Sequence, residues 1–301
     1  MTTLTLATRR SKLALAQARA YAEHLVAAQP DAEAAPLAVQ ELHVVTSGDR
    51  IVDRPLQEVG GKGLFIKEIE EALLEGRADF AVHSIKDVPA ELAPQLHLTA
   101  IPSREDPRDV LITRDGAGLA DLPQGARVGT SSLRRKCLLL RQRPDLEVGP
   151  LRGNVDTRLR KLDEGQVDAI VLALAGLRRL DLTARATEIL APEMMLPAVG
   201  QGALGIECRV GDEAVQARLA HTDDAATRVR VLGERAFMAA VGGSCLLPVA
   251  AYGERDEDGG LWLRAMVADP DGRRPRFGER HARYDADDAE RAGRDLGDEL
   301  R

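Results

Sequence analysis

Short runs typical of β-strands alternate with helical patterns through the first two thirds of this 301-residue chain. The first series consists of TLTLAT, a helical pattern over residues 11–28, VQELHVV, the helical FIKEIEEALLEG, ADFAVHS and HLTAIP. A second series consists of DVLIT, RVGTS, LEVGPL and DAIVLALAGL, with two arginine-bearing helical patterns between them. This alternation is typical of a parallel α/β sheet covered by helices.

The pattern changes near residue 225. One helix, AATRVRVLGERAFMAA, is followed by strand-like runs near LLPVAAY, LWLRAMVAD and PRFGERHARY and then by an acidic helix, which predicts a small α+β unit. The charged, proline-bearing residues 103–109 suit a crossover between domains, and LAPEMMLPAVGQGALGIECR suits the return of the chain. We therefore expect three domains: residues 1–102 with 200–220, residues 103–199, and residues 221–301.

Composition narrows the class of protein. A chain with 44% hydrophobic residues can bury full cores, and no run of about 20 apolar residues is present to span a membrane. The first residues are interrupted by charge and do not resemble a signal peptide, so we expect a cytoplasmic protein.

Cys137, Cys208 and Cys245 are odd in number and far apart, which predicts neither a disulfide framework nor a metal site. Cys137 and Cys208 lie in apolar runs and read as core residues.

Arginines gather at two predicted turns from strand to helix between Gly129 and Leu159. Ser131 and Ser132 can cap the first helix and Asn154 the second, so free backbone N–H groups and the positive end of a helix dipole coincide there with cationic side chains. Guanidinium groups bind carboxylates or phosphates through paired hydrogen bonds. The arginines of this segment are Arg134, Arg135, Arg152 and Arg158.

A small anionic ligand suits these arginines better than a nucleic acid. The chain has a formal net charge of -7 and only 3% aromatic residues, which disfavours both a broad phosphate-tracking surface and stacking of bases. Arg9 and Ser11 form a further anion-binding turn at the first helix, and Arg179 extends the set. GGKG near residue 62 lacks the spacing of a phosphate-binding P-loop, so we exclude a nucleoside triphosphate site.

The segment HSIKDVP places polar residues at the carboxyl end of a predicted strand, where ligands of α/β folds bind. Asp87 is the best candidate for a catalytic carboxylate, with Lys86 beside it, and His83 is a secondary candidate. The long polar loop over residues 46–63 is typical of a lid. Cys245 lies in a turn-rich setting that can present a thiol at a cleft.

Eight segments in order resemble the hydroxymethylbilane synthase family, also called porphobilinogen deaminases. They are ATRRSKLALAQA, GGKGLFIKEIE, HSIKDVP, REDPRD, GTSSLRRKCLL, LRGNVDTRL, LPAVGQGALGIECR and GGSCLLPVA, spread from about residue 6 to 250. The resemblance implies a transferase of tetrapyrrole (porphyrin and heme) biosynthesis, in which porphobilinogen units are joined head to tail with release of ammonia and then of hydroxymethylbilane. It also implies a monomer that acts on a small molecule without nucleic-acid or membrane partners.

The resemblance assigns roles to individual residues. A covalent dipyrromethane cofactor would be attached to Cys245, although Ser244 stands between the glycine pair and the thiol. Asp87 would bind pyrrole N–H groups and stabilise the cationic azafulvene formed when ammonia leaves. The acetate and propionate groups of each pyrrole would be held by cations, because burying them unpaired is costly. The resemblance implies that the cofactor is bound by Lys86, Ser132, Arg134, Arg135 and Arg158. It implies that the substrate is bound by Arg9, Ser11, Arg152 and Arg179. No metal is expected.

The expected fold is two doubly wound α/β domains like those of type II periplasmic binding proteins, plus a small C-terminal α+β domain that carries Cys245. Segments 101–106 and 195–202 would act as hinges. A solute-binding protein with the same two-lobed fold is an alternative that a secretion signal would favour. A ligand-sensing transcription regulator is a second alternative, but the alternating strands leave no room for a helix-turn-helix module. Neither alternative explains Cys245.

Overall fold

Strands and helices alternate along the chain as the sequence pattern predicts. The computed structural model describes residues 2–29, 36–50, 65–242 and 247–301. The chain divides into two compact units: the first comprises Met1–Arg104 and Ala203–Arg228, and the second comprises Glu105–Gly202 and Val229–Arg301. The chain thus leaves the first unit within one expected crossover and returns to it within the other. The division of the second unit into two domains stays a prediction.

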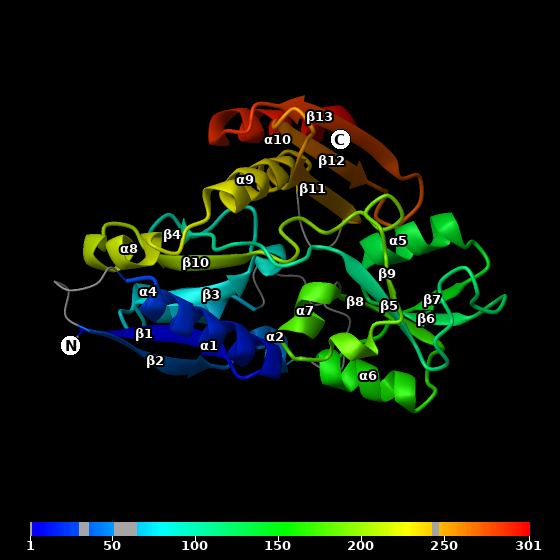
Figure 1. Ribbon diagram of the computed structural model, residues 1–301, viewed down its shortest axis with the longest axis horizontal. Coiled ribbons are helices and arrows are strands. Elements are labelled where there is room, and N and C mark those ends of the chain that lie inside the picture. The colour runs from blue at the N-terminus through cyan, green and yellow to red at the C-terminus, as the bar shows by residue number, and fades with distance from the viewer. Residues whose placement is uncertain (1, 30–35, 51–64, 243–246) are drawn as a thin grey trace. The chain divides into compact units, whose positions relative to one another are not determined.

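A five-stranded sheet forms the centre of the first unit. Its elements are β1 (Thr2–Arg9), α1 (Lys12–Ala27), β2 (Leu37–Val44), α2 (Ser47–Arg50), α4 (Lys67–Leu74), β3 (Phe80–Ser84), the 3₁₀ turn η1 (Ile85–Asp87), β4 (Leu96–Ala100), β10 (Leu204–Arg209) and α8 (Glu213–Ala220). The strand order is β2-β1-β3-β10-β4 (Figure 1). Strand β1 is parallel to β2 and β3, whereas β10 is antiparallel to β3 and β4. The expectation of a parallel sheet is therefore wrong for β10, because this strand enters from the opposite direction after the chain returns.

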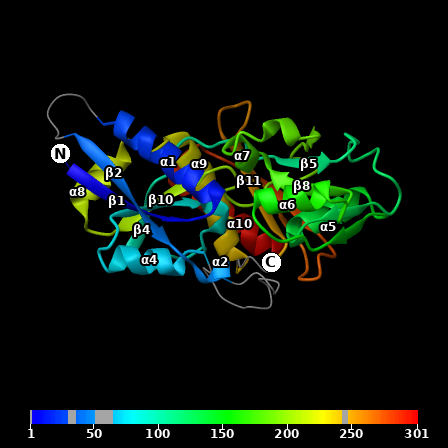
Figure 2. The ribbon, with the colours of Figure 1, turned by 90° about the horizontal axis from the view of Figure 1, so that it is seen from below.

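Helices cover both faces of this sheet because successive strand residues point to opposite sides. Leu6 and Phe80 pack with Tyr21 and Leu25 of α1, whereas the adjacent Ala7 and Ala81 pack with residues of α4. Figure 2 shows α1 and α4 on opposite sides of β1 and β2. Helix α1 begins directly after β1, so its N-terminus lies at the carboxyl end of that strand.

The second unit contains another five-stranded sheet, in the order β7-β6-β8-β5-β9. Its elements are β5 (Asp109–Thr113), β6 (Arg127–Gly129), α5 (Leu133–Gln142), β7 (Glu147–Gly149), α6 (Val155–Asp163), β8 (Ala169–Ala173), α7 (Leu174–Arg178), the 3₁₀ turn η2 (Thr183–Arg185) and β9 (Glu188–Ile189). Strand β6 is parallel to β7 and β8, but β5 is antiparallel to β8 and β9, so this sheet is mixed as well. Leu111 and Val171 pack with α5, and Val110 and Ile170 pack with α6 on the other face (Figure 1).

A three-stranded antiparallel sheet completes the second unit. It consists of β11 (Val249–Arg255), β12 (Leu261–Val267) and β13 (Arg276–Ala282), with α9 (Ala225–Ala240) and α10 (Ala286–Leu300). Leu261 and Leu263 pack with Phe237 of α9 and Leu296 of α10. The two helices approach closely at Gly293, where an added Cβ would lie 2.2 Å from a carbonyl oxygen of α9. Two α/β sheets and a small α+β layer confirm the expected fold class. None of the described helices is long and apolar enough to cross a bilayer.

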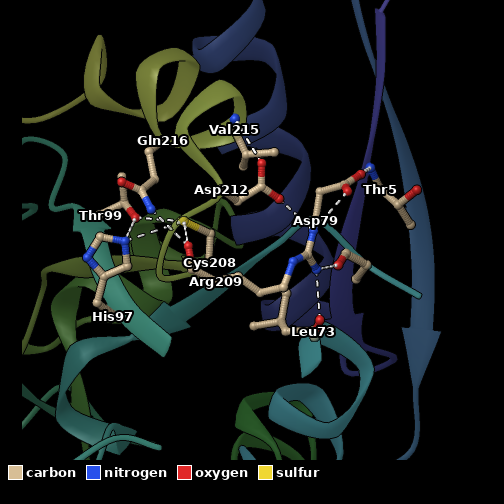
Figure 3. A network of polar contacts seen from close by, with 11 residues as sticks. Thr5, Leu73, Asp79, His97, Thr99, Cys208, Arg209, Asp212, Val215 and Gln216 are labelled. Carbon is tan, nitrogen blue, oxygen red and sulfur yellow. Dashed lines mark hydrogen bonds and ion pairs between the residues drawn. The ribbon is translucent and has the colours of Figure 1, made fainter. Parts of the chain in front are cut away.

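Arg209, the last residue of β10, ties this strand to neighbouring elements of the first unit (Figure 3). Its Nη1 donates to the carbonyl oxygens of Leu73 and Ala78 at 2.7 and 2.6 Å. Its Nη2 donates to Asp212 at 2.7 Å and lies 3.5 Å from Asp79. One guanidinium group therefore satisfies carbonyl groups at the end of α4 and before β3 while pairing with two carboxylates.

Substitution Arg209→Ala is expected to lower the free energy of unfolding by roughly 2–4 kcal/mol, because two carbonyl groups and two carboxylates each lose a charged partner. Urea denaturation measures the change. The control is Arg19→Ala, which removes an ion pair to Glu41 from a side chain that is 59% exposed, and little change is expected there. Equal effects of the two substitutions would contradict the role given to Arg209.

Candidate active site

A pocket in the first unit lies where β1 and β3 end. Three of the residues predicted from the sequence, Arg9, Ser11 and Asp87, line it together. Lys86 precedes Asp87 in the same 3₁₀ turn and is half-buried, whereas Asp87 is exposed. The full lining is Arg9, Ser11, Leu13, Ala14, Gln17, Phe65, Ile66, Ile69, Val82, His83, Ser84 and Asp87. The structure thus brings the substrate-binding and catalytic candidates of this unit to one edge of the sheet.

The guanidinium group of Arg9 is held from two sides. Its Nε lies 3.1 and 3.2 Å from the two carboxylate oxygens of Asp49, and its Nη2 also donates to Asp49. The ring of Phe65 lies below it, 4.2 Å from Cζ to the ring centroid. Burial by itself would raise the pKa of Asp49, but hydrogen bonds from Arg9 and Thr46 outweigh burial and lower this pKa. Asp49 therefore stays ionised and occupies the fork that was expected to bind a ligand carboxylate.

Ser11 caps α1, as the sequence predicts, and accepts a hydrogen bond from the backbone N–H of Ala14 at 3.3 Å. Gln17, one and a half turns further along the buried face, donates to Ser84 at 3.1 Å. The sequence analysis missed Gln17. A polar residue on the otherwise apolar face of an amphipathic helix was the available signal.

His83 projects from β3 into the interior and also lines the pocket. Its Nε2 lies 2.8 Å from Oε2 of Glu207, and both side chains are buried. The sequence analysis did not single out Glu207. A carboxylate inside the apolar run ALGIEC was the available signal, because such groups are rarely buried without a partner.

The two arginine-bearing turns of the second unit lie side by side. Strands β6 and β7 pair in parallel with Gly129 opposite Gly149, and the N–H of Thr130 donates to the carbonyl of Gly149 at 2.8 Å. An added Cβ on Gly129 would lie 2.8 Å from the side chain of Leu151, so only glycine permits this approach. The N-termini of α5 and α6 therefore meet at one end of the sheet.

The caps of these helices differ. Ser132 accepts from the backbone N–H of Arg135 at 3.4 Å and caps α5 as predicted. Ser131 instead donates to the carbonyl of Leu151 at 3.0 Å, and the Asn154 side chain forms no cap hydrogen bond. The first turn of α6 therefore keeps backbone N–H groups that its own cap residue leaves unsatisfied.

Arg134 and Arg135 lie inside the second unit, with exposed fractions of 4% and 6%. Both form ion pairs with the fully buried Asp109, at 2.8 and 2.7 Å. Gln201 donates to the same carboxylate at 2.9 Å. Burial would raise the pKa of Asp109, but the two guanidinium groups outweigh it and hold this pKa far below its ordinary value. Burial lowers the pKa of Arg134, and the charge of Asp109 opposes that change. The trio carries one net positive charge.

Arg152, Arg158 and Arg179 are half-buried in the second unit. Nη1 of Arg152 is buried and has no hydrogen-bond partner among the described residues. Arg158 donates from Nε to the carbonyl of Gly153 at 2.7 Å. Arg179 donates to the carbonyl of Gly202 at 2.7 Å, and burial lowers its pKa to about 10 despite the charge of Glu105. An orphaned guanidinium nitrogen is the kind of group that binds a ligand oxygen.

Cys137 and Cys208 are buried, which confirms their expected place in the cores, and burial raises the pKa of both thiols. Cys208 lies beside Thr99 and His97 in the first unit (Figure 3). The expected cofactor attachment residue, Cys245, lies outside the described residues. So does most of the expected lid, of which the structure describes Thr46 to Arg50.

Both units can therefore bind small anions by the same chemistry. In each, a helix N-terminus at the carboxyl end of a strand coincides with guanidinium groups, and this combination favours carboxylates or phosphates. In the first unit an exposed carboxylate, Asp87, stands beside the cationic Arg9 in one pocket. Such a pocket can bind a ligand that carries both acidic groups and N–H donors.

Two family models match the chain in succession. One is described as "Porphobilinogen deaminase, dipyromethane cofactor binding domain" and matches residues 4–217. The other is described as "Porphobilinogen deaminase, C-terminal domain" and matches residues 228–301. Together the two models match nearly the whole chain, including the pocket residues of the first unit and the arginines of the second.

Curated proteins named porphobilinogen deaminase are similar to this chain over nearly its full length. A porphobilinogen deaminase of Sorangium cellulosum (strain So ce56) is 64% identical over 302 residues, which cover 100% of this chain and 99% of that protein. One of Roseiflexus sp. (strain RS-1) is 51% identical over 298 residues, which cover 99% and 95%. Among solved structures, the periplasmic VFT2 domain of Bordetella pertussis BvgS aligns at 15% identity with a TM-score of 0.44, over 73% of this chain and 86% of that one. On the two matching models and the full-length relatives, this chain belongs to the porphobilinogen deaminase family.

Proposed function

We propose that this chain joins porphobilinogen units head to tail on a covalent dipyrromethane cofactor, releases ammonia at each addition, and then releases hydroxymethylbilane. Family membership over nearly the entire chain is the observation that carries this assignment. The reaction makes the protein a transferase of tetrapyrrole biosynthesis. The pocket in the first unit suits porphobilinogen, because the substrate carries two carboxylates and a pyrrole N–H group that match Arg9 and Asp87.

The donor set of the second unit fits the acidic side chains of a dipyrromethane. The trio of Arg134, Arg135 and Asp109 retains one positive charge. The Ser132 cap and the α5 N-terminus add hydrogen-bond donors at the same end of the sheet. When bound, the cofactor supplies the pyrrole carbon to which the first substrate unit is joined. We assign its tether to Cys245 and its carboxylates to Lys86, Ser132, Arg134, Arg135 and Arg158.

Substrate carboxylates fall to Arg9, Ser11, Arg152 and Arg179. Asp87 accepts hydrogen bonds from pyrrole N–H groups and offsets the positive charge that develops on the substrate as ammonia leaves. The 3₁₀ turn after β3 fixes its backbone, since the N–H of Val88 donates to the carbonyl of Ile85 at 3.0 Å. Contacts with Asp49 and Phe65 hold the half-buried Arg9 in position before substrate arrives.

We further propose that the enzyme works as a monomer in the cytoplasm, on a small-molecule substrate and without nucleic-acid or membrane partners. The cysteine pattern suits a reducing compartment, because it contains no paired framework. The net charge of -7 disfavours binding along a nucleic-acid backbone.

Mass spectrometry of the intact protein tests the tether. Protein folded in the presence of porphobilinogen is expected to gain the mass of two porphobilinogen-derived rings, and Cys245→Ala is expected to gain none, because it lacks the sulfur that forms the bond. Cys208→Ala is the matched control and keeps the increment, since this thiol is buried in a core. An unmodified mass in the unsubstituted protein would overturn the assignment.

Substitution Asp87→Asn is expected to leave cofactor loading and substrate binding intact and to lower kcat by about 100-fold or more, because the amide keeps the shape of the side chain but loses its negative charge. Steady-state kinetics together with the intact mass separate the two effects. The control is Asp163→Asn, which removes an exposed carboxylate paired with Arg185 on the surface. Turnover near that of the unsubstituted enzyme in Asp87→Asn would refute the catalytic role.

Substitution Arg152→Met is expected to raise KM by roughly 10-fold to 100-fold, because the loss of one hydrogen bond between charged groups costs about 1.5–3 kcal/mol. Initial-rate measurements over a range of porphobilinogen concentrations give KM. Arg160→Met, in the helix α6 that follows Arg152, is the matched control, since its exposed guanidinium pairs only with Glu164 among the described residues. An unchanged KM in Arg152→Met would remove Arg152 from the substrate site.

A further inference from the structure

His83 and Glu207 form a buried pair across two strands of the first unit. In the antiparallel register of β3 and β10, His83 lies opposite Gly205, so Glu207 occupies the diagonal position on the same face. The distance from Nε2 to Oε2 is 2.8 Å, and the side chains are 5% and 0% exposed. Glycine leaves room opposite His83, because an added Cβ on Gly205 would lie 2.5 Å from the end of the Ile85 side chain.

The carboxylate of Glu207 is poorly compensated where it lies. Its Oε1 is buried and has no hydrogen-bond partner among the described residues. Burial raises the pKa of Glu70 on α4, and the negative charge of nearby Glu207 raises this pKa further. No arginine or lysine pairs with Glu207 in the part of the chain that the structure describes, so His83 is the group that can balance its charge.

His83 connects this pair to the pocket that contains Asp87. The imidazole lines the pocket together with Ser84 and Asp87. Since Nε2 is engaged by Glu207, Nδ1 is the ring nitrogen left for another partner, and no hydrogen bond to it is found within the described ranges. A proton can therefore pass between the pocket and Nδ1 while Glu207 holds the ring in place.

The proposed reaction requires such a proton carrier. When the substrate, whose aminomethyl group enters as –NH3+, loses ammonia, the bond between the aminomethyl carbon and nitrogen breaks and its electron pair leaves with nitrogen. That carbon then forms a new bond to a ring carbon of the acceptor pyrrole, and the ring C–H bond breaks with release of a proton. Ammonia finally takes up one proton and departs as ammonium. One proton is thus released at one atom and consumed at another.

We propose that His83 receives this proton on Nδ1 and returns it to ammonia, and that Glu207 is the positioning residue that orients the imidazole and balances its charge. The proposal rests on the proposed function of the chain. It gives His83 a task separate from the electrostatic role proposed for Asp87. It also gives a reason why Glu207 is buried although its Oε1 has no hydrogen-bond partner among the described residues.

Kinetics of His83→Gln and Glu207→Gln test the proposal. His83→Gln is expected to lower kcat about 100-fold with little change in KM, because general acid–base catalysis typically contributes this much or more. Glu207→Gln is expected to lower kcat about 10-fold, because the imidazole loses the carboxylate that orients it. Other charged groups around the ring are Glu70, Asp87 and Arg9, and Glu70→Gln is included so that an effect caused by Glu70 is recognised.

His97→Gln is the matched control. His97 lies on β4, is partnered with Thr99, and is absent from the pocket lining, so kcat and KM are expected to stay unchanged. A kcat in His83→Gln equal to that of the unsubstituted enzyme would overturn the proposal. So would an unchanged kcat in Glu207→Gln.

Nitrogen-15 NMR of the histidine rings gives a readout that does not depend on turnover. The chain has 6 histidines, and the signals missing in His83→Gln identify those of His83. In the unsubstituted protein Nε2 is expected to carry a proton, and Glu207→Gln is expected to change the Nε2 shift; unchanged shifts would overturn the pairing. If Glu207→Gln fails to fold, the His83→Gln kinetics decide. Failure of the unsubstituted enzyme to form hydroxymethylbilane would instead refute the proposed function and leave the NMR result standing.

Discussion

The buried ion trio of Asp109, Arg134 and Arg135 is the interaction on which the second unit depends. It joins the first residue of β5 to the first turn of α5, and Gln201 links the same carboxylate to the segment that returns to the first unit. Removing one member of such a group leaves an unbalanced charge in the interior, which is far more costly than the loss of a surface pair. The N-terminus of α5 is therefore fixed in position before any ligand binds.

Protein carboxylates also limit how much positive charge each unit offers. Asp49 occupies the fork of Arg9, and Asp109 is shared by two arginines. The number of arginines in the sequence thus overstates the charge that a ligand meets. These pairings keep guanidinium groups oriented when no ligand is present, because an unpaired cation would otherwise turn toward water. The arrangement favours a ligand whose several acid groups meet cations already held in place.

Much of the fold and of the site follows from local sequence patterns. The strand and helix alternation, the caps at Ser11 and Ser132, and the burial of Cys137 and Cys208 depend on neighbours in sequence. The antiparallel entry of β10 does not, because strand direction depends on where the chain returns from. The ion-pair partners of the arginines could not be predicted from the sequence either, since Asp109 lies 26 residues before Arg135. Pairings over such separations leave no periodic signal.

The position of β10 has a consequence for how this chain folds during its synthesis. In the sheet order β2-β1-β3-β10-β4, the strand made last stands between two strands made about a hundred residues earlier. Until the ribosome has released residues 204–209, β3 and β4 both present bare backbone edges, which are open to wrong pairings. An amino-terminal fragment ending near residue 104 would leave β4 with no strand to pair with. Completion of the first unit must therefore wait until residues 105–202 of the second unit have emerged.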